Sequence, residues 1–189
     1  MKVRVIIFAL LMLSGTKSYT FFAPSDVVKD KNKNQLVLTS AHTALFSADN
    51  LFKNRMSPND INQWNNVLKG IKDFVQKNAS EYMNYFNTLS KASDTLINSI
   101  KVIFNTKDNK DTAERQRLVL NNILILNTTR SQMIKIQKDL ASEKTRITNK
   151  TIITASARQT KLLVIDLLSV LALTLELTCD KIINDSAKN

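Results

Sequence analysis

Apolar residues follow helical spacings over most of the chain, and the densest run lies near its end. Residues 162–179 read LLVIDLLSVLALTLELTC, which is apolar except for two acids, a serine and two threonines. At ~100° per residue its polar groups share one narrow stripe of a helix: Asp166, Ser169, Glu176 and, just beyond the run, Asp180. A helix that is apolar on nearly all other sides is normally surrounded by partners. We therefore expect a central bundle helix over 152–183, with this acidic stripe facing solvent.

The same run is nearly long enough to cross a membrane, which takes ~20 predominantly apolar residues. Asp166 and Glu176 argue against a permanent span, because an acid at the centre of an inserted helix costs ~2.5–3.5 kcal/mol. A soluble core helix is the favoured interpretation, and a helix that inserts conditionally is the alternative. The candidate membrane-interacting residues are Leu162, Leu163, Val164, Ile165, Leu167, Leu168, Val170, Leu171, Leu173 and Leu175. Thr174 and Thr178 lie off the acidic stripe, where their hydroxyls can bond back to the helix backbone.

A seven-residue repeat organises the middle of the chain. Ser57, Pro58 and Asp60 have the spacing of a helix-capping box with proline at the first helical position. The apolar residues that follow at every seventh position are Ile61, Leu68, Val75, Tyr82, Leu89, Leu96 and Ile103. A period of 3.5 residues is typical of left-handed, knobs-into-holes packing. The pattern predicts one long helix over 57–105, which would be ~65–70 Å long at ~1.5 Å per residue if it is unbroken.

Two residues inside this predicted helix interrupt its apolar pattern. Gly70 costs ~1 kcal/mol relative to alanine in a helix, so it predicts either a bend or a close crossing by another helix. Asn78 lies three residues after the repeat residue Val75, at a second core-facing position of the repeat, where a polar residue can fix the register of packing. That interpretation competes with glycosylation of Asn78, because a glycan could not point into the bundle.

Two further helices complete the predicted fold. Apolar residues three and four apart predict a helix over 27–54, and a second seven-residue repeat predicts one over 111–147. This repeat comprises Val119, Leu126, Met133, Leu140 and Ile147. The chain has only two glycines and two prolines, and short connections between long helices imply antiparallel neighbours. The predicted fold class is all-α, an elongated antiparallel (up-down-up-down) four-helix bundle with heptad-type packing in a single domain, 19–189.

The first residues have the composition of a secretory signal. Lys2 and Arg4 precede an apolar core at 5–13 and a short polar segment of small residues at 14–18. This predicts a signal peptide over 1–18 and an exported protein, extracellular or, in a bacterium, periplasmic. Its removal leaves 24 basic and 16 acidic residues, a net charge of +8 instead of +11.

A basic exported protein can meet anionic membranes, glycosaminoglycans or nucleic acid. The lysines of this chain are dispersed, and no arginine-rich helix face carries interleaved aromatic residues, so we expect no nucleic-acid binding. An anionic membrane or lipid remains a candidate partner. The sequons at Asn127, Asn149 and Asn184 are candidate N-glycosylation sites in a eukaryote.

Catalytic and metal-binding patterns are missing from the sequence. It has no glycine-rich phosphate loop and no nucleophile elbow, and His42, the single histidine, cannot form a two-histidine metal site. Cys179 is the single cysteine, so no disulfide can form within the chain. It is expected to be a buried hydrophobe, with an intermolecular disulfide that makes a dimer as the alternative. We expect neither enzymatic activity nor a cofactor or metal.

The expected function is therefore that of a secreted, non-enzymatic helical bundle that acts through an unidentified protein partner. The alternative is a membrane-active, pore-forming-like or lipid-binding protein that uses the apolar helix 152–183. The heptads of 57–105 favour a stable interaction module, whereas the unusually apolar last helix favours the alternative.

Overall fold

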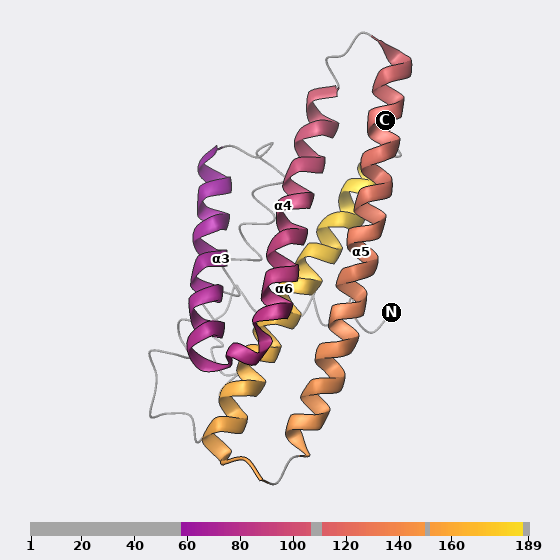
Figure 1. Ribbon diagram of the computed structural model, residues 1–189. Helices are drawn as coiled ribbons and strands as arrows, with labels where there is room; N and C mark the ends of the chain where they lie inside the picture. Colours follow the sequence, from indigo (N-terminus) through magenta and orange to yellow (C-terminus); the bar gives the residue numbers. More distant parts are fainter. Residues whose placement is uncertain (1–57, 107–110, 150–151, 187–189) are drawn as a thin grey trace, which may run out of the picture. The chain divides into compact units, whose positions relative to one another are not determined.

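The computed structural model describes residues 58–106, 111–149 and 152–186, and these stretches are helical without a strand (Figure 1). The α-helices are α3 (Pro58–Asn78), α4 (Met83–Asn105), α5 (Thr112–Thr148) and α6 (Ala155–Ser186), and a 3₁₀ turn, η4 (Ser80–Tyr82), joins the first two. They pack on one another as a helical bundle, which confirms the predicted all-α class. The predicted signal peptide 1–18, the predicted helix 27–54 and His42 lie outside the described residues.

The prediction of one continuous helix over 57–105 is wrong, because the chain folds back on itself between α3 and α4. Ala79 leaves the helical conformation, with φ −161° and ψ 68°. The indole of Trp64 in α3 reaches Ser93 in α4, although 29 positions separate them. In one straight helix these residues would be ~44 Å apart. The seven-residue repeat continues through the break at Ala79 because α3 and α4 both turn their apolar repeat residues toward the same core.

The structure changes the interpretation of Asn78 and excludes one of the two roles that the sequence suggested for Gly70. Asn78 is the last residue of α3, is half-buried, and donates its side-chain amide to the carbonyl of Phe74 at 2.8 Å. Such a local bond competes with continuation of the helix, so Asn78 helps to end α3 rather than to set a core register. A Cβ added at Gly70 would meet nothing within 4 Å, which excludes a close crossing by another described helix.

The central position predicted for the last helix is confirmed by its burial. Eleven residues of α6 are buried, among them Ile165, Leu168 and Leu171. Thr174 and Thr178 are also buried, and their hydroxyls donate to the carbonyls of Val170 and Thr174 as expected. Burial of large aliphatic side chains supplies most of the favourable free energy of folding, so α6, which has more buried apolar residues than any other described helix, contributes most to the core.

The third predicted helix, 111–147, matches α5 almost residue for residue. Asp111 caps α5 by accepting hydrogen bonds from the backbone N–H groups of Ala113 and Glu114 at 3.0 and 3.1 Å, a typical N-cap arrangement. Four of its five repeat positions are buried and Val119 is half-buried. The predicted helix 152–183 begins three residues later than expected, after Thr154, whose hydroxyl accepts from the N–H of Ala157 at 3.2 Å.

Side-chain contacts give the relative direction of the last two helices. Ion pairs and a hydrogen bond join Arg130 to Asp180, Gln137 to Glu176, and Lys144 to Asp166. Residue numbers rise along α5 while those of the partners fall along α6, so these two helices run in opposite directions. The alternating order of all four predicted helices stays a prediction.

Candidate functional site

The candidate membrane-interacting segment lies in α6, and the bundle covers most of it. Val164, Ile165, Leu167, Leu168, Leu171 and Leu175 are buried, whereas Leu162, Leu163, Val170 and Leu173 are half-buried. Among the described residues, α6 is the helix that is long and apolar enough to cross a membrane, and 56% of its most apolar 18-residue window is buried. Most of this segment is therefore part of the core of the bundle.

The acidic stripe of α6 is only partly exposed to solvent, because it lies against α5, which the sequence did not predict. Its three acids lie along α5, where each meets a donor. Asp166 is 2.5 Å from the ammonium of Lys144, Glu176 accepts from the side-chain amide of Gln137 at 2.6 Å, and Asp180 is 2.5 Å from the guanidinium of Arg130. We call these three contacts the α5–α6 polar ladder. The donors are seven residues apart on α5, so they lie two helical turns from one another on the face of α5 that packs on α6.

The polar ladder orients α6 more than it stabilises the bundle. Lys144 and Asp166 are 49% and 34% exposed, and exposed ion pairs contribute only ~0–1 kcal/mol each. Burial of the apolar surface on the remaining sides of α6 contributes more stability. The acids instead select the face of α6 that packs on α5, because burying them elsewhere would leave charges without partners.

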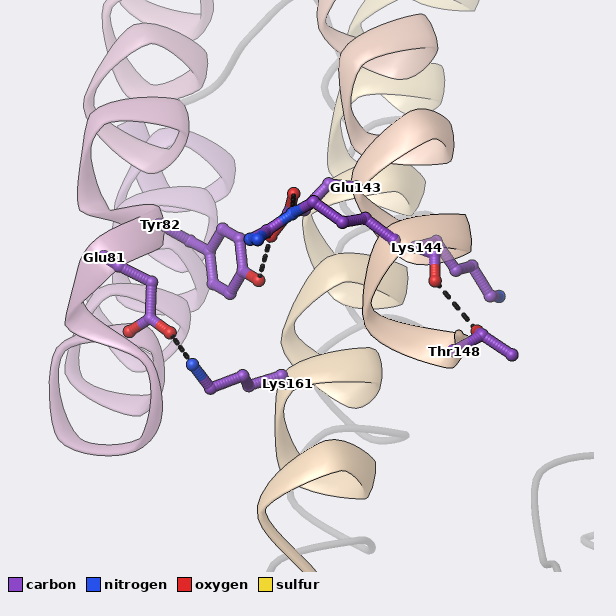
Figure 2. Close-up of polar contacts among 7 residues, drawn as sticks. Glu81, Tyr82, Glu143, Lys144, Thr148 and Lys161 are labelled. Atoms are coloured by element: carbon purple, nitrogen blue, oxygen red, sulfur yellow. Dashed lines mark hydrogen bonds and ion pairs between the residues drawn. The ribbon is translucent and has the colours of Figure 1, made fainter. Parts of the chain in front are cut away.

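A second group of polar contacts joins the hairpin turn to α5 and α6 (Figure 2). The Tyr82 hydroxyl donates to Glu143 at 2.8 Å, and Glu143 also accepts two hydrogen bonds from Arg146. Glu81 pairs with Lys161 of α6. Burial, and then the hydrogen bond to Glu143, raise the pKa of Tyr82 well above its usual value. The phenol therefore stays protonated and acts as a structural donor.

The outer face of α5 carries exposed leucines that the sequence analysis did not single out. Leu120 and Leu124 are 65% and 67% exposed, one helical turn apart and on the side away from the buried Leu126. Gln116 and Arg117 are exposed one turn earlier. We call Gln116, Arg117, Leu120 and Leu124 the α5 outer patch. A signal was available in the sequence, because Leu120 and Leu124 fall outside the seven-residue repeat of the helix.

The candidate glycosylation sites all lie at exposed positions. Asn127 is on the same side of α5 as Leu120 and Leu124, Asn149 follows the last residue of α5, and Asn184 is in the last turn of α6. Asn78 is half-buried and engaged with the backbone of its own helix. Use of any of these sequons stays a prediction.

Cys179 is a free thiol in the interior of the bundle, with no exposed surface. Burial, together with the nearby Asp180 carboxylate, raises its pKa to about 12. A thiol that is both protonated and inaccessible is a poor nucleophile. A disulfide to a second chain, which stays a prediction, would require the surrounding helices to separate first.

No arrangement of catalytic or metal-binding groups stands out in the part of the chain that is described. No group of three or more His, Cys, Asp or Glu side chains is close enough to hold a metal ion within these residues. A shallow groove of about 440 Å³ runs between α3 and α4. Its lining residues are mostly polar: Asn65, Leu68, Lys69, Lys72, Asp73, Phe86, Asn87, Ser90 and Asp94.

Comparison with known proteins adds no family to this description. No protein-family model, no curated protein and no solved structure matches the chain. Two features of the described residues bear on function, the α5 outer patch and the apolar segment of α6.

Proposed function

We propose that this protein is an exported, non-enzymatic helical bundle that acts by binding another protein through the α5 outer patch. The observation that carries the proposal is the exposure of Leu120 and Leu124, at 65% and 67%, on a helix whose apolar repeat residues are buried or half-buried. Fully burying a leucine side chain contributes ~1.5–3 kcal/mol. A partner that buries both leucines would therefore obtain a substantial part of the free energy needed for specific binding.

The charge beside the leucines indicates the chemistry of the partner. Arg117 lies one turn from Leu120, next to the exposed Gln116, and also pairs with Glu114 on its own helix at 2.8 Å. Arginine is enriched at binding hot spots because it combines an apolar stem with a multidentate charged head. The expected partner presents an apolar pocket bordered by carboxylates, which would also speed association by electrostatic steering.

Site-specific photo-crosslinking tests this proposal. A photoreactive residue is placed at position 124, and in a control at position 63, where Gln63 is exposed on α3. Each protein is added to the extracellular fluid of the source organism. We expect a discrete protein adduct from position 124 that is missing from position 63 and is lost when Leu120 and Arg117 are replaced by Asp and Glu. Identical adducts from both positions would contradict binding through the α5 outer patch.

A second candidate function is membrane activity through α6. The observation that favours it is the length and apolar composition of this helix, which are sufficient for a membrane span. In this function the bundle carries α6 through water and releases it at a lipid surface, and the excess of basic residues in the chain would attract anionic headgroups. Flotation of the mature protein with liposomes distinguishes insertion, which causes dye leakage, from adsorption, which high salt reverses.

A further inference from the structure

We propose that protonation of Asp166 and Glu176 is the trigger that moves α6 from the bundle into a lipid bilayer. This inference rests on the second candidate function, membrane activity. It adds the chemical signal, acid, and the two carboxyl groups that receive it.

The charges of the apolar segment make such a trigger possible. Between Leu162 and Cys179 the only charged side chains are Asp166 and Glu176, and both are acids. The nearest bases, Lys161 and Lys181, flank the segment, where long cationic side chains can reach lipid headgroups. Two protons would therefore convert residues 162–179 into a helix without charge. A lysine or arginine in the same segment would have kept its charge at any physiological pH.

The bundle provides a donor for each of the two acids. The ammonium of Lys144 pairs with the carboxylate of Asp166, and the side-chain amide of Gln137 donates to the carboxylate of Glu176. The next rung of the polar ladder pairs Asp180 with Arg130. The Cys179 thiol lies near Glu176 and Asp180, and the Glu81–Lys161 pair lies at the start of α6. No contact with Asp166 or Glu176 from a charged side chain of α3 or α4 is found among the described residues.

The direction of the pH effect follows from these surroundings. The bundle offers donors to the carboxylates, whereas hydrocarbon offers none and requires the neutral acids. The inserted state therefore binds more protons than the bundle, and acid shifts the equilibrium toward insertion. Insertion is therefore expected to increase as the pH falls below neutrality.

The experiment uses the full mature chain and liposomes of anionic or neutral lipid, at about pH 7 and about pH 5. The test variant is D166N/E176Q, which fixes both groups in a neutral state. The matched control is E114Q/D139N, which removes two acids of α5 that lie outside the polar ladder. The readouts are flotation at high salt and leakage of a trapped dye. Circular dichroism and the emission of Trp64 first verify that each variant folds without lipid.

The single variant E176Q keeps the proposal testable if D166N/E176Q does not fold. Its new amide can still pair with the side chain of Gln137, so the contact to α5 is retained. We expect the wild type to insert at about pH 5 and D166N/E176Q to insert at about pH 7 at least ~10-fold more than the wild type, with E176Q intermediate. The control variant should follow the wild type at both pH values.

The other outcomes distinguish a failure of the acid trigger from a failure of membrane activity itself. Equal insertion of the wild type at both pH values would overturn the trigger and leave membrane activity standing. Insertion of the wild type only in acid, with D166N/E176Q unchanged at about pH 7, would show that other groups receive the protons and would also overturn it. No insertion of any protein under any condition would overturn both the trigger and the second candidate function.

Discussion

The indole N–H of Trp64 donates to the hydroxyl of Ser93 at 2.5 Å, and both side chains are buried. This contact joins α3 to α4 across the hairpin that η4 closes (Figure 1). Trp64 is 2% exposed, so the hydroxyl of Ser93 replaces the water that the indole N–H loses on folding. A buried donor without an acceptor costs ~1–3 kcal/mol, and the contact therefore specifies how the two helices align.

Replacing Ser93 by alanine should lower the free energy of unfolding by about 1–3 kcal/mol, because the indole N–H is left without an acceptor. Urea denaturation followed by circular dichroism measures this change, also in the variants that lack Trp64, the single tryptophan. The control is Ser142→Ala, since the exposed Ser142 hydroxyl bonds to the carbonyl of Lys138 in its own helix. The double variant W64F/S93A should cost less than the sum of the single variants. Strict additivity would mean that the hydrogen bond does not couple α3 to α4.

Replacing Gly70 by alanine should stabilise the protein by about 0.5–1 kcal/mol. Gly70 lies inside α3, where glycine is less favourable than alanine, and a new Cβ would meet nothing within 4 Å. The gain comes mainly from the smaller conformational freedom of the unfolded chain. Thermal unfolding of G70A beside the wild type provides the measurement. A lower midpoint would show that the helix needs glycine at this position for a bend.

Sequence patterns predicted the core of this bundle better than its connections. The repeat from Ile61 to Ile103 identified residues that are buried, except Ile61, which is half-buried. Periodicity reports which side of a helix faces the core, but it does not report whether the helix is continuous. The break at Ala79 has neither glycine nor proline to mark it, and it depends on local bonds such as the one from Asn78 to Phe74.

The candidate surfaces were predictable only in part, for a similar reason. The apolar composition of 162–179 identified the buried segment of α6 directly. The polar ladder could not be predicted, because it depends on which neighbour lies beside α6, and the donors Lys144 and Arg130 are ordinary helix-surface residues in the sequence. Long-range pairing of this kind is decided by tertiary packing and leaves no local pattern.

Replacing Leu168 and Leu171 by aspartate should unfold the bundle. Both side chains are essentially without exposed surface, and each substitution removes apolar burial and introduces a buried charge, at several kcal/mol per site. Native domains are stable by only ~5–15 kcal/mol. Circular dichroism should show a large loss of helix at room temperature.

The matched control for that variant is L120D/L124D, which makes the same chemical change on the exposed side of α5. It should retain the helical signal and unfold within about 1 kcal/mol of the wild type. With the photoreactive residue kept at position 124, the L120D change alone should weaken the crosslink from the α5 outer patch. Comparable unfolding by both variants would show that the α5 leucines belong to the core, and would remove the basis for the proposed interaction surface.

Cys179 should make the protein less stable at alkaline pH. Burial raises the pKa of its thiol from an ordinary value of 9.0 to about 12, so the folded state keeps the proton while the unfolded state releases it. The stabilisation from the neutral buried thiol is complete below the unfolded pKa and is lost as the pH rises toward the folded pKa.

Between about pH 7.5 and 10.5 the free energy of unfolding of the wild type should fall by about 2 kcal/mol more than that of Cys179→Ala. Urea denaturation of both proteins in reducing buffer at the two pH values measures the difference. Parallel losses in the two proteins would mean that the thiol reaches solvent in the folded state, which would restore the intermolecular disulfide as a route to a dimer.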